Sequence, residues 1–226
     1  TGYPSIDKPW LKYYSEEAIN APLPENTVYG YMKQQNADNL AGTALTYYGR
    51  RVSYAELLRR IDETAAAFAA LGVKENNVVS FCMPTTPEIV YAFYALNKLG
   101  AVANLIDLRT NAANIQQYVA STRSKVLVTL DLCLPKVQTF AEKAGVERVI
   151  VVSVGDSMPL HMRLGYKLIA GKDAPAVTET ASVLTWARFV RLGADQREVY
   201  APPYVPRRAA AIVYTGGTTG LPKGAV

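Results

Sequence analysis

The sequence predicts a doubly wound α/β fold, in which helices cover both faces of a mainly parallel sheet. From residue 78 onward, short runs that are apolar throughout alternate with segments of helical periodicity. Strands without polar alternation are typical of parallel sheets that are buried on both faces. Half of the 226 residues are apolar, and the mean hydropathy is +0.02. This composition suits a globular chain of one large domain or one and a half.

The first 42 residues predict an extended lead-in. Several prolines between residues 4 and 24 interrupt it, so we expect two short helical turns rather than a long helix. Aromatic residues such as Trp10, Tyr13 and Tyr14 give this segment apolar surface to bury. We therefore expect it to wrap the α/β subdomain that follows over residues 43–226.

The subdomain opens with a predicted hairpin and a long helix. Residues 44–48 and 51–54 are strand-like runs on either side of a glycine. Ser53 and Glu56 have the spacing of a capping box, which predicts a helix start, and Gly72 predicts its end. The apolar positions of this helix are Leu57, Leu58, Ile61, Ala65, Phe68 and Leu71.

The alternation that defines the fold class follows this helix. A strand followed by a helix and then another buried strand predicts a parallel pair with a crossover connection. Glycines close two of the helices, as is common at helix C-termini. Strands are predicted at 78–83, 101–106, 125–130 and 148–154, and helices at 86–99, 111–122 and 135–144.

Residues 155–208 break this rhythm with scattered prolines and glycines. They contain a basic amphipathic piece, residues 161–172, and a short predicted helix, residues 186–192. A segment of this length between two core strands predicts an excursion over the surface. The next core strand is predicted at 209–214.

That strand leads into a segment that reads TGGTTGLPKGAV from Thr215 to Val226. Glycines allow successive N–H groups to turn toward an anion, and threonine hydroxyls and a lysine add donors and charge. A Walker A loop is excluded because Pro222 precedes Lys223 and Gly224 follows it, where that motif needs Gly and Ser or Thr. The segment predicts a phosphate cradle of another kind, with a solvated Gly/Thr hairpin as the alternative.

The order T-[SG]-G-T-T-G-x-P-K-G after a buried strand resembles the phosphate-binding signature of the adenylate-forming superfamily. This superfamily includes acyl-CoA synthetases, the adenylation domains of peptide synthetases, and luciferases. Upstream, the segment PEIVYAFYALNKLGAVAN is most similar to acyl-CoA synthetases. Together with the terminal motif, the resemblance covers residues 44–226. The matching positions are Thr215, Gly216, Gly217, Thr218, Thr219, Gly220, Pro222, Lys223 and Gly224, with Gly216 where Ser is commoner.

The resemblance implies an enzyme that uses ATP, Mg²⁺ and coenzyme A. A carboxylate attacks the α-phosphorus of MgATP, pyrophosphate leaves, and a thiol captures the acyl-adenylate. A fatty acid of medium or long chain is the implied substrate, while aromatic and amino acids stay open. The implied contacts are hydroxyl contacts from Thr215, Thr218 and Thr219, backbone N–H contacts from Gly216, Gly217 and Gly220, and a contact of Lys223 with the leaving pyrophosphate.

The later motifs of that superfamily do not occur in these 226 residues. They supply the adenine pocket, the acid that coordinates magnesium, the aspartate that holds the ribose, the acyl pocket, and a catalytic lysine on a mobile C-terminal domain. We therefore expect an N-terminal piece of a longer enzyme, with no complete catalytic site and no activity by itself. The alternative is a non-enzymatic α/β binding or interaction module with a decayed phosphate loop, which a reading frame ending near Val226 would favour.

The charge and the Cys and His content of the chain bear on whether it binds nucleic acid, anionic ligands or metals. The chain carries 24 Lys and Arg against 19 Asp and Glu, a net charge of +5, without a long basic run. This excess suits anionic ligands and does not require nucleic acid. Cys82 and Cys133 lack a metal-ligand spacing and are expected to be buried thiols, and the single histidine, His161, cannot make a zinc site, so we expect no metal site.

Two expectations concern membranes. The chain has neither a signal peptide nor a run of about 18 apolar residues, so we expect a cytoplasmic protein. Residues 162–172 mix Leu, Ile and Tyr with Arg and Lys, as a membrane-surface helix can. Gly165 and Gly171 weaken that helix, which favours a solvated or core-capping segment over peripheral membrane contact.

Overall fold

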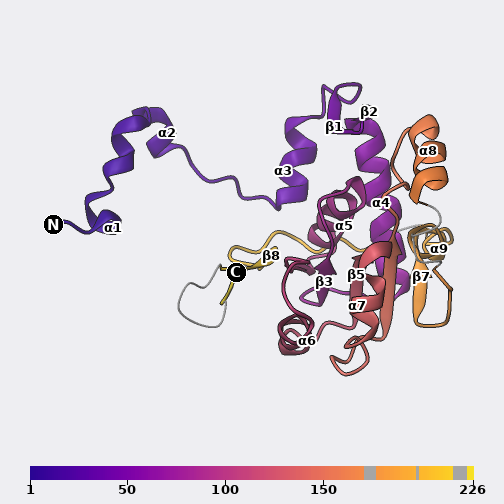
Figure 1. Cartoon of the computed structure of the whole chain (residues 1–226). Helices are drawn as coiled ribbons and strands as arrows, with labels where there is room; N and C mark the ends of the chain where they lie inside the picture. The colour runs from indigo at the N-terminus through magenta and orange to yellow at the C-terminus, as the bar shows by residue number, and fades with distance from the viewer. Residues whose placement is uncertain (171–176, 197–198, 216–222) are drawn as a thin grey trace.

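A seven-stranded sheet forms the centre of the protein (Figure 1). The computed structural model describes residues 1–170, 177–196, 199–215 and 223–226. The strand order is β7-β6-β5-β3-β4-β8-β9, and every neighbouring pair is parallel except β8 and β9. The predicted fold class is confirmed. The strands are β3 (Val78–Cys82), β4 (Val102–Leu105), β5 (Val126–Leu130), β6 (Arg148–Val152), β7 (Val183–Thr185), β8 (Ala211–Tyr214) and β9 (Gly224–Ala225).

Helices bury both faces of the sheet. On one face, Phe68, Phe81 and Phe189 belong to one cluster, in which the rings of Phe68 and Phe189 are 4.8 Å apart. On the other face, Ile115 and Val137 pack in a second cluster. The first face is covered by α4 (Tyr54–Ala70), α5 (Pro87–Lys98) and α9 (Trp186–Leu192), and the second by α6 (Ala112–Ser121) and α7 (Leu134–Gln138), which follows the short η2 (Asp131–Cys133).

The connections reverse direction at the middle of the sheet. The chain passes from β3 to its neighbour β4 through α5, and then crosses back through α6 to β5 on the other side of β3. Right-handed crossovers in opposite directions place α5 and α6 on opposite faces. Ligands of open α/β sheets bind at the carboxyl ends of strands beside such a reversal. The crevice at the carboxyl ends of β3 and β5, whose following helices α5 and α7 lie on opposite faces, is therefore where a ligand site is expected.

The hairpin and capping predictions hold with one difference. β1 (Thr43–Tyr47) and β2 (Arg50–Ser53) form a separate antiparallel pair, joined by Tyr48 and Gly49 with φ of 47° and 81°. Positive φ at both central positions is typical of a type I′ turn. The Ser53 hydroxyl accepts a hydrogen bond from the Glu56 N–H at 3.2 Å, as predicted. The Glu56 carboxylate pairs instead with Arg50 at 2.5 Å, which ties α4 to β2.

The N-terminal segment differs from its prediction. None of its first three helical pieces contains a buried residue, and Figure 1 shows them away from the sheet. Prolines 22 and 24 favour an extended linker, which separates these turns from the subdomain. The prediction that this segment wraps the subdomain is therefore wrong for its first three helical pieces. Only the fourth, α3, packs against the subdomain, on α5. The pieces are α1 (Pro4–Asp7), η1 (Pro9–Tyr13), α2 (Glu16–Asn20) and α3 (Val28–Gln35).

The stretch 155–208 also needs a correction, because it is not only a surface excursion. It contributes β7 to the sheet beside β6, and Phe189 of α9 to the core. The three residues of β7 are too few to show a period, so pairing with β6 was invisible in the sequence. The rest includes α8 (Leu160–Ala170), where the amphipathic piece was predicted. The helix predicted at 135–144 is shorter, since α7 ends at Gln138.

Candidate functional site

The candidate site lies at the carboxyl end of β8. This strand lies beside β4 in parallel register, with Asn104 opposite Ile212 and Leu105 opposite Val213. It therefore ends at the same carboxyl edge of the sheet as β3 and β4. Of the predicted phosphate-binding residues, only Thr215 and Lys223 are placed. Gly216, Gly217, Thr218, Thr219 and Gly220 lie outside the described residues, as does Pro222.

Thr215 and Lys223 close the two ends of the predicted cradle. The Thr215 N–H donates to the Lys223 carbonyl at 2.9 Å, and the Lys223 N–H donates to the Thr215 hydroxyl at 3.2 Å. The antiparallel pairing continues outward, with Tyr214 opposite Gly224. Thr215 and Lys223 thus form the hydrogen-bonded neck between the two arms of a hairpin. A carboxylate partner for the Lys223 ammonium is absent among the described residues, which leaves this charge available for an anion.

Gly224 is required by close packing at the neck. A Cβ at this position would lie 3.0 Å from Ile212 Cγ2 and 3.4 Å from Tyr214 Cε1. The first separation is tighter than ordinary van der Waals contact, so a side chain here would push Ile212 aside. The glycine after Lys223 in the motif therefore has a structural reason in this chain.

Tyr214 anchors the strand that precedes the loop. Its ring stacks on Tyr118 of α6, with centroids 4.0 Å apart and an interplanar angle of 15°. Tyr118 is buried, and burial raises the pKa of Tyr214. In the sequence, Tyr214 is only the end of an apolar strand, and this contact is not visible there. Nothing in either local pattern indicates a partner so distant along the chain.

A buried polar network lies behind the stack. The Asn104 amide of β4 donates to the Ser80 hydroxyl at 2.9 Å and to Thr122 at 3.3 Å. The Ser80 N–H donates to the Ser124 hydroxyl at 2.9 Å. These bonds join β3, β4 and the C-terminal end of α6, so they fix the strand next to β8. Ser80 and Asn104 interrupt runs that are otherwise apolar, and that interruption was a usable sequence signal.

The loop after β4 is held by its own ion pair. Arg109 contacts Asp107 at 2.6 Å, and its hydrogen bonds lower the pKa of Asp107 to about 2. The Lys136 ammonium of α7 donates to the carbonyls of Leu108 and Thr110. Asp107 and Arg109 are both exposed, so their ion pair positions the loop rather than stabilising the fold. The Asp107 carboxylate also compensates the charge of Arg109, whereas no described carboxylate compensates that of Lys223.

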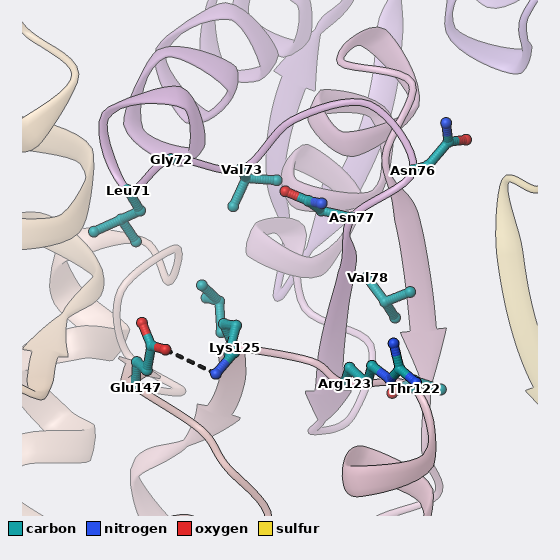
Figure 2. Close-up of a pocket in the computed structure, with 11 residues that line it drawn as sticks. Leu71, Gly72, Val73, Asn76, Asn77, Val78, Thr122, Arg123, Lys125 and Glu147 are labelled. Atoms are coloured by element: carbon teal, nitrogen blue, oxygen red, sulfur yellow. Dashed lines mark ion pairs between the residues drawn. The ribbon is translucent and has the colours of Figure 1, made fainter.

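A cavity of about 420 Å³ opens at the amino ends of the central strands, opposite to the carboxyl ends where the candidate site lies. Figure 2 shows its lining residues, among them Lys125 and Glu147, which form an ion pair at 2.8 Å. Val78 and Lys125 lie at or just before the amino ends of β3 and β5. Because Thr215 follows the carboxyl end of β8, this cavity is not part of the candidate site.

The two cysteines and the single histidine do not form a metal site within the described part of the chain. Burial raises the pKa of the Cys82 thiol to about 11, and Cys133 is partly buried with its pKa also raised, mainly by burial. His161 is exposed on α8. Among the described residues, no group of His, Cys, Asp and Glu is arranged to hold a metal ion. Nor is any described helix both long and apolar enough to cross a membrane.

Solved structures share this fold. The chain superimposes with a TM-score of 0.71 on an anthranilate CoA ligase in complex with anthranoyl-AMP, at 18% identity over 89% of this chain and 35% of that one. A benzoate CoA ligase from Burkholderia xenovorans LB400 gives a TM-score of 0.61 at 17% identity, over 88% of this chain and 34% of that one.

Curated relatives are more similar in sequence. A long-chain-fatty-acid–CoA ligase of Bacillus subtilis is 25% identical over 96% of this chain and 39% of its own length. A 3-hydroxypropionyl-coenzyme A synthetase of Sulfurisphaera tokodaii is 31% identical over 77% of this chain and 25% of its own length. The chain thus spans well under half of these relatives. The model of the AMP-binding enzyme family matches residues 32–226, from α3 through the sheet to the hairpin of Thr215 and Lys223, and the chain therefore belongs to that family.

Proposed function

We propose that this chain forms the ATP-phosphate-binding part of an AMP-forming acid–CoA ligase. The observation that carries the proposal is the hairpin neck of Thr215 and Lys223, at the carboxyl edge of the sheet, inside the region matched by the AMP-binding family. The curated relatives include ligases and synthetases of coenzyme A. The proposed activity is formation of an acyl-adenylate followed by a CoA thioester.

The residues of this chain would act by position and charge. Nucleotidyl transfer needs donors and cations aimed at the leaving pyrophosphate, where negative charge accumulates. Lys223 fits that role because no described carboxylate neutralises it, and Thr215 fixes the neck with both its N–H and its hydroxyl. The glycines and threonines of the loop would supply the remaining donors. Bound MgATP supplies the electrophilic α-phosphorus, and coenzyme A supplies the thiol.

For the acid, we propose a fatty acid of medium or long chain. The long-chain-fatty-acid–CoA ligase matches 96% of this chain, which supports this choice. Other relatives are named for different acids, including crotonobetaine or carnitine and 4-coumarate. Aromatic and amino acids are therefore the alternatives that a substrate panel must include.

We also propose that residues 1–226 alone do not turn over ATP. Charged hydrogen bonds contribute roughly 1.5 to 3 kcal/mol each. Association and loop ordering cost on the order of 4 kcal/mol or more. A few contacts then leave about 4 kcal/mol, which corresponds to near-millimolar affinity. Weak ATP binding, together with the absence of the superfamily's later motifs from these residues, is the ground for expecting no turnover.

The test is carboxylate-dependent ATP–pyrophosphate exchange over a panel of fatty, aromatic and amino acids. A protein that carries this chain within a full-length ligase should exchange with one acid class, whereas residues 1–226 should not. Lys223→Gln in that protein should lower the exchange rate at least tenfold, and the exposed Lys143→Gln is the charge-matched control. Production of ADP in place of AMP would overturn the adenylation proposal.

One surface observation favours a second function, peripheral membrane contact through α8. Leu160, Leu164 and Leu168 recur at a spacing of four on this helix, and all three are exposed. Arg163 lies on the same helix, and such a mixture binds anionic lipid surfaces. Flotation with vesicles containing phosphatidylserine should recover the protein, and the variant with all three leucines changed to Gln should stay unbound. Equal recovery with neutral vesicles would remove the electrostatic part of this proposal.

A further inference from the structure

A second cavity lies at the end of the sheet opposite to β8. Its volume is about 450 Å³, within the range of about 300 to 1,000 Å³ that small-molecule sites occupy. Its lining comes from β2, α4, α5, α8 and α9, together with the loop that follows β6. Because β6 and β7 lie at one end of the strand order and β8 near the other, this cavity is distinct from the phosphate hairpin.

Guanidinium groups converge on this cavity from four separate elements. They belong to Arg50 of β2, Arg60 of α4, Arg163 of α8 and Arg191 of α9. Glu56 compensates the first two, at 2.5 Å from Arg50 and 3.8 Å from Arg60. Within the described ranges, neither Arg163 nor Arg191 has an ion pair; Arg191 Nε donates only to the carbonyl of its own helix at Ala187. The cavity therefore has an excess of positive charge.

A buried hydroxyl without a partner belongs to the same cavity. Tyr91 is 3% exposed, and its hydroxyl makes no hydrogen bond to any described residue. Burial raises its pKa, and Glu88, Arg50 and Arg60 act on it electrostatically, which places the hydroxyl among the charged groups of the lining. A buried donor without an acceptor is costly, and native structures rarely keep one. A bound oxyanion would accept this hydrogen bond.

The buried carboxyl group of the lining does not oppose an anion. Glu88 is 3% exposed and accepts a hydrogen bond from the Ser157 hydroxyl. Burial raises its pKa, so its surroundings favour the neutral form. Asp156, the other acidic lining residue, accepts the Ser153 N–H at 2.9 Å. Trp186 and Val190 provide apolar wall against which the carbon part of a ligand can pack.

We propose that this cavity is a second ligand site, which binds a small molecule through one carboxylate or phosphate group. Arg163 and Arg191 contact the oxyanion, Tyr91 donates its hydroxyl hydrogen, and Trp186 covers the rest of the ligand. The site does not depend on the ligase proposal, because it shares no residue with the phosphate hairpin.

Calorimetric titration with inorganic phosphate and, separately, with acetate tests the site at constant ionic strength. The double variant Arg163→Gln with Arg191→Gln should weaken binding of the preferred anion at least tenfold. Arg51→Gln with Arg188→Gln changes the net charge equally at exposed positions outside the lining, and should bind like the unmodified protein. Binding that is equal in the two double variants overturns the proposal. So does phosphate binding that Lys223→Gln abolishes and the Arg163, Arg191 variant retains, since the anion then occupies only the hairpin.

Tyr91→Phe separates binding from folding. It removes the unpartnered hydroxyl without changing the packing, so the melting temperature without anion should stay equal or rise. The increase in melting temperature that the anion causes should become smaller than in the unmodified protein. An anion-dependent increase identical in both proteins would exclude Tyr91 from the site and overturn the assigned geometry.

Discussion

The centre of the sheet and its β8–β9 margin are built from similar apolar strands but differ in what covers them. Val79 of β3 is 1% exposed, since helices pack on both faces there, whereas Val213 of β8 is 52% exposed. Beyond the backbone pairing of β8 with β4, the margin is held by the ring stack of Tyr214 on Tyr118 and the hydrogen bonds at the hairpin neck. Stability therefore resides in the centre, and the candidate chemistry lies where the backbone remains accessible.

This difference has a functional consequence. A phosphate cradle must present backbone N–H groups to a ligand, and a buried strand cannot do so because its N–H groups are already paired. The Thr215 N–H is the last of β8 that the structure describes as paired, and the polar network of Ser80 and Asn104 fixes the strands beside it. The margin is accordingly positioned by the centre without being buried in it.

The largest expected effect is at the centre. Phe81→Ala should lower the free energy of unfolding by about 3 to 5 kcal/mol, because it removes a fully buried ring between the sheet and the helices on its first face. Urea denaturation followed by circular dichroism measures this change. A loss under 1 kcal/mol would mean that the centre is not the stabilising part.

Tyr214→Ala should cost less, about 2 kcal/mol, since the ring is only partly buried and its stack contributes about 1 kcal/mol beyond burial. The same denaturation experiment checks it. Tyr118→Ala combined with Tyr214→Ala should cost less than the sum of the single changes, because both remove one contact. Additive losses would contradict the stack as the anchor of β8.

The third prediction contrasts a buried and an exposed carboxyl group. The pKa of Glu88 is raised in the folded state, so the unfolded chain loses this proton first as pH rises above the ordinary value of 4.5. Stability should then fall with pH by at most about 1.4 kcal/mol per pH unit. Glu88→Gln should flatten this slope between pH 4.5 and 7. Asp107→Asn should leave it unchanged there, because the Asp107 pKa is lowered to about 2 and its contribution falls only at lower pH.

The smallest expected effect is at the exposed strand itself. Val213→Thr should change the free energy of unfolding by less than about 0.5 kcal/mol, since the side chain is largely in solvent and threonine keeps the β-branched shape. Val79→Thr is the matched change at the centre and should cost several times more, because it buries a hydroxyl. Equal effects of the two changes would remove the distinction between centre and margin.

The fold class, most strands and helices, and the family of the phosphate loop could be predicted from the sequence. Runs such as Val78–Cys82 and Val126–Leu130 are apolar throughout, and the caps at Ser53 and Asn111 act within three or four residues. These signals are local, so they can be read without knowing which segments meet. The Thr215 to Gly224 motif is local in the same sense, although residues 216–222 of it lie outside the described residues.

Which distant residues meet is visible only in the folded chain. β7 is a strand because β6 offers it a free edge, and Tyr214 is an anchor because α6 brings Tyr118 to its ring. The four arginines of the second cavity come from elements spread over much of the chain. The Tyr91 hydroxyl lacks a hydrogen-bond partner only because packing of the whole chain buries it. Hydrophobic periodicity indicates which face of a segment is buried, and capping residues indicate where a helix begins or ends. They do not report its particular neighbour, because that choice depends on the packing of the whole chain.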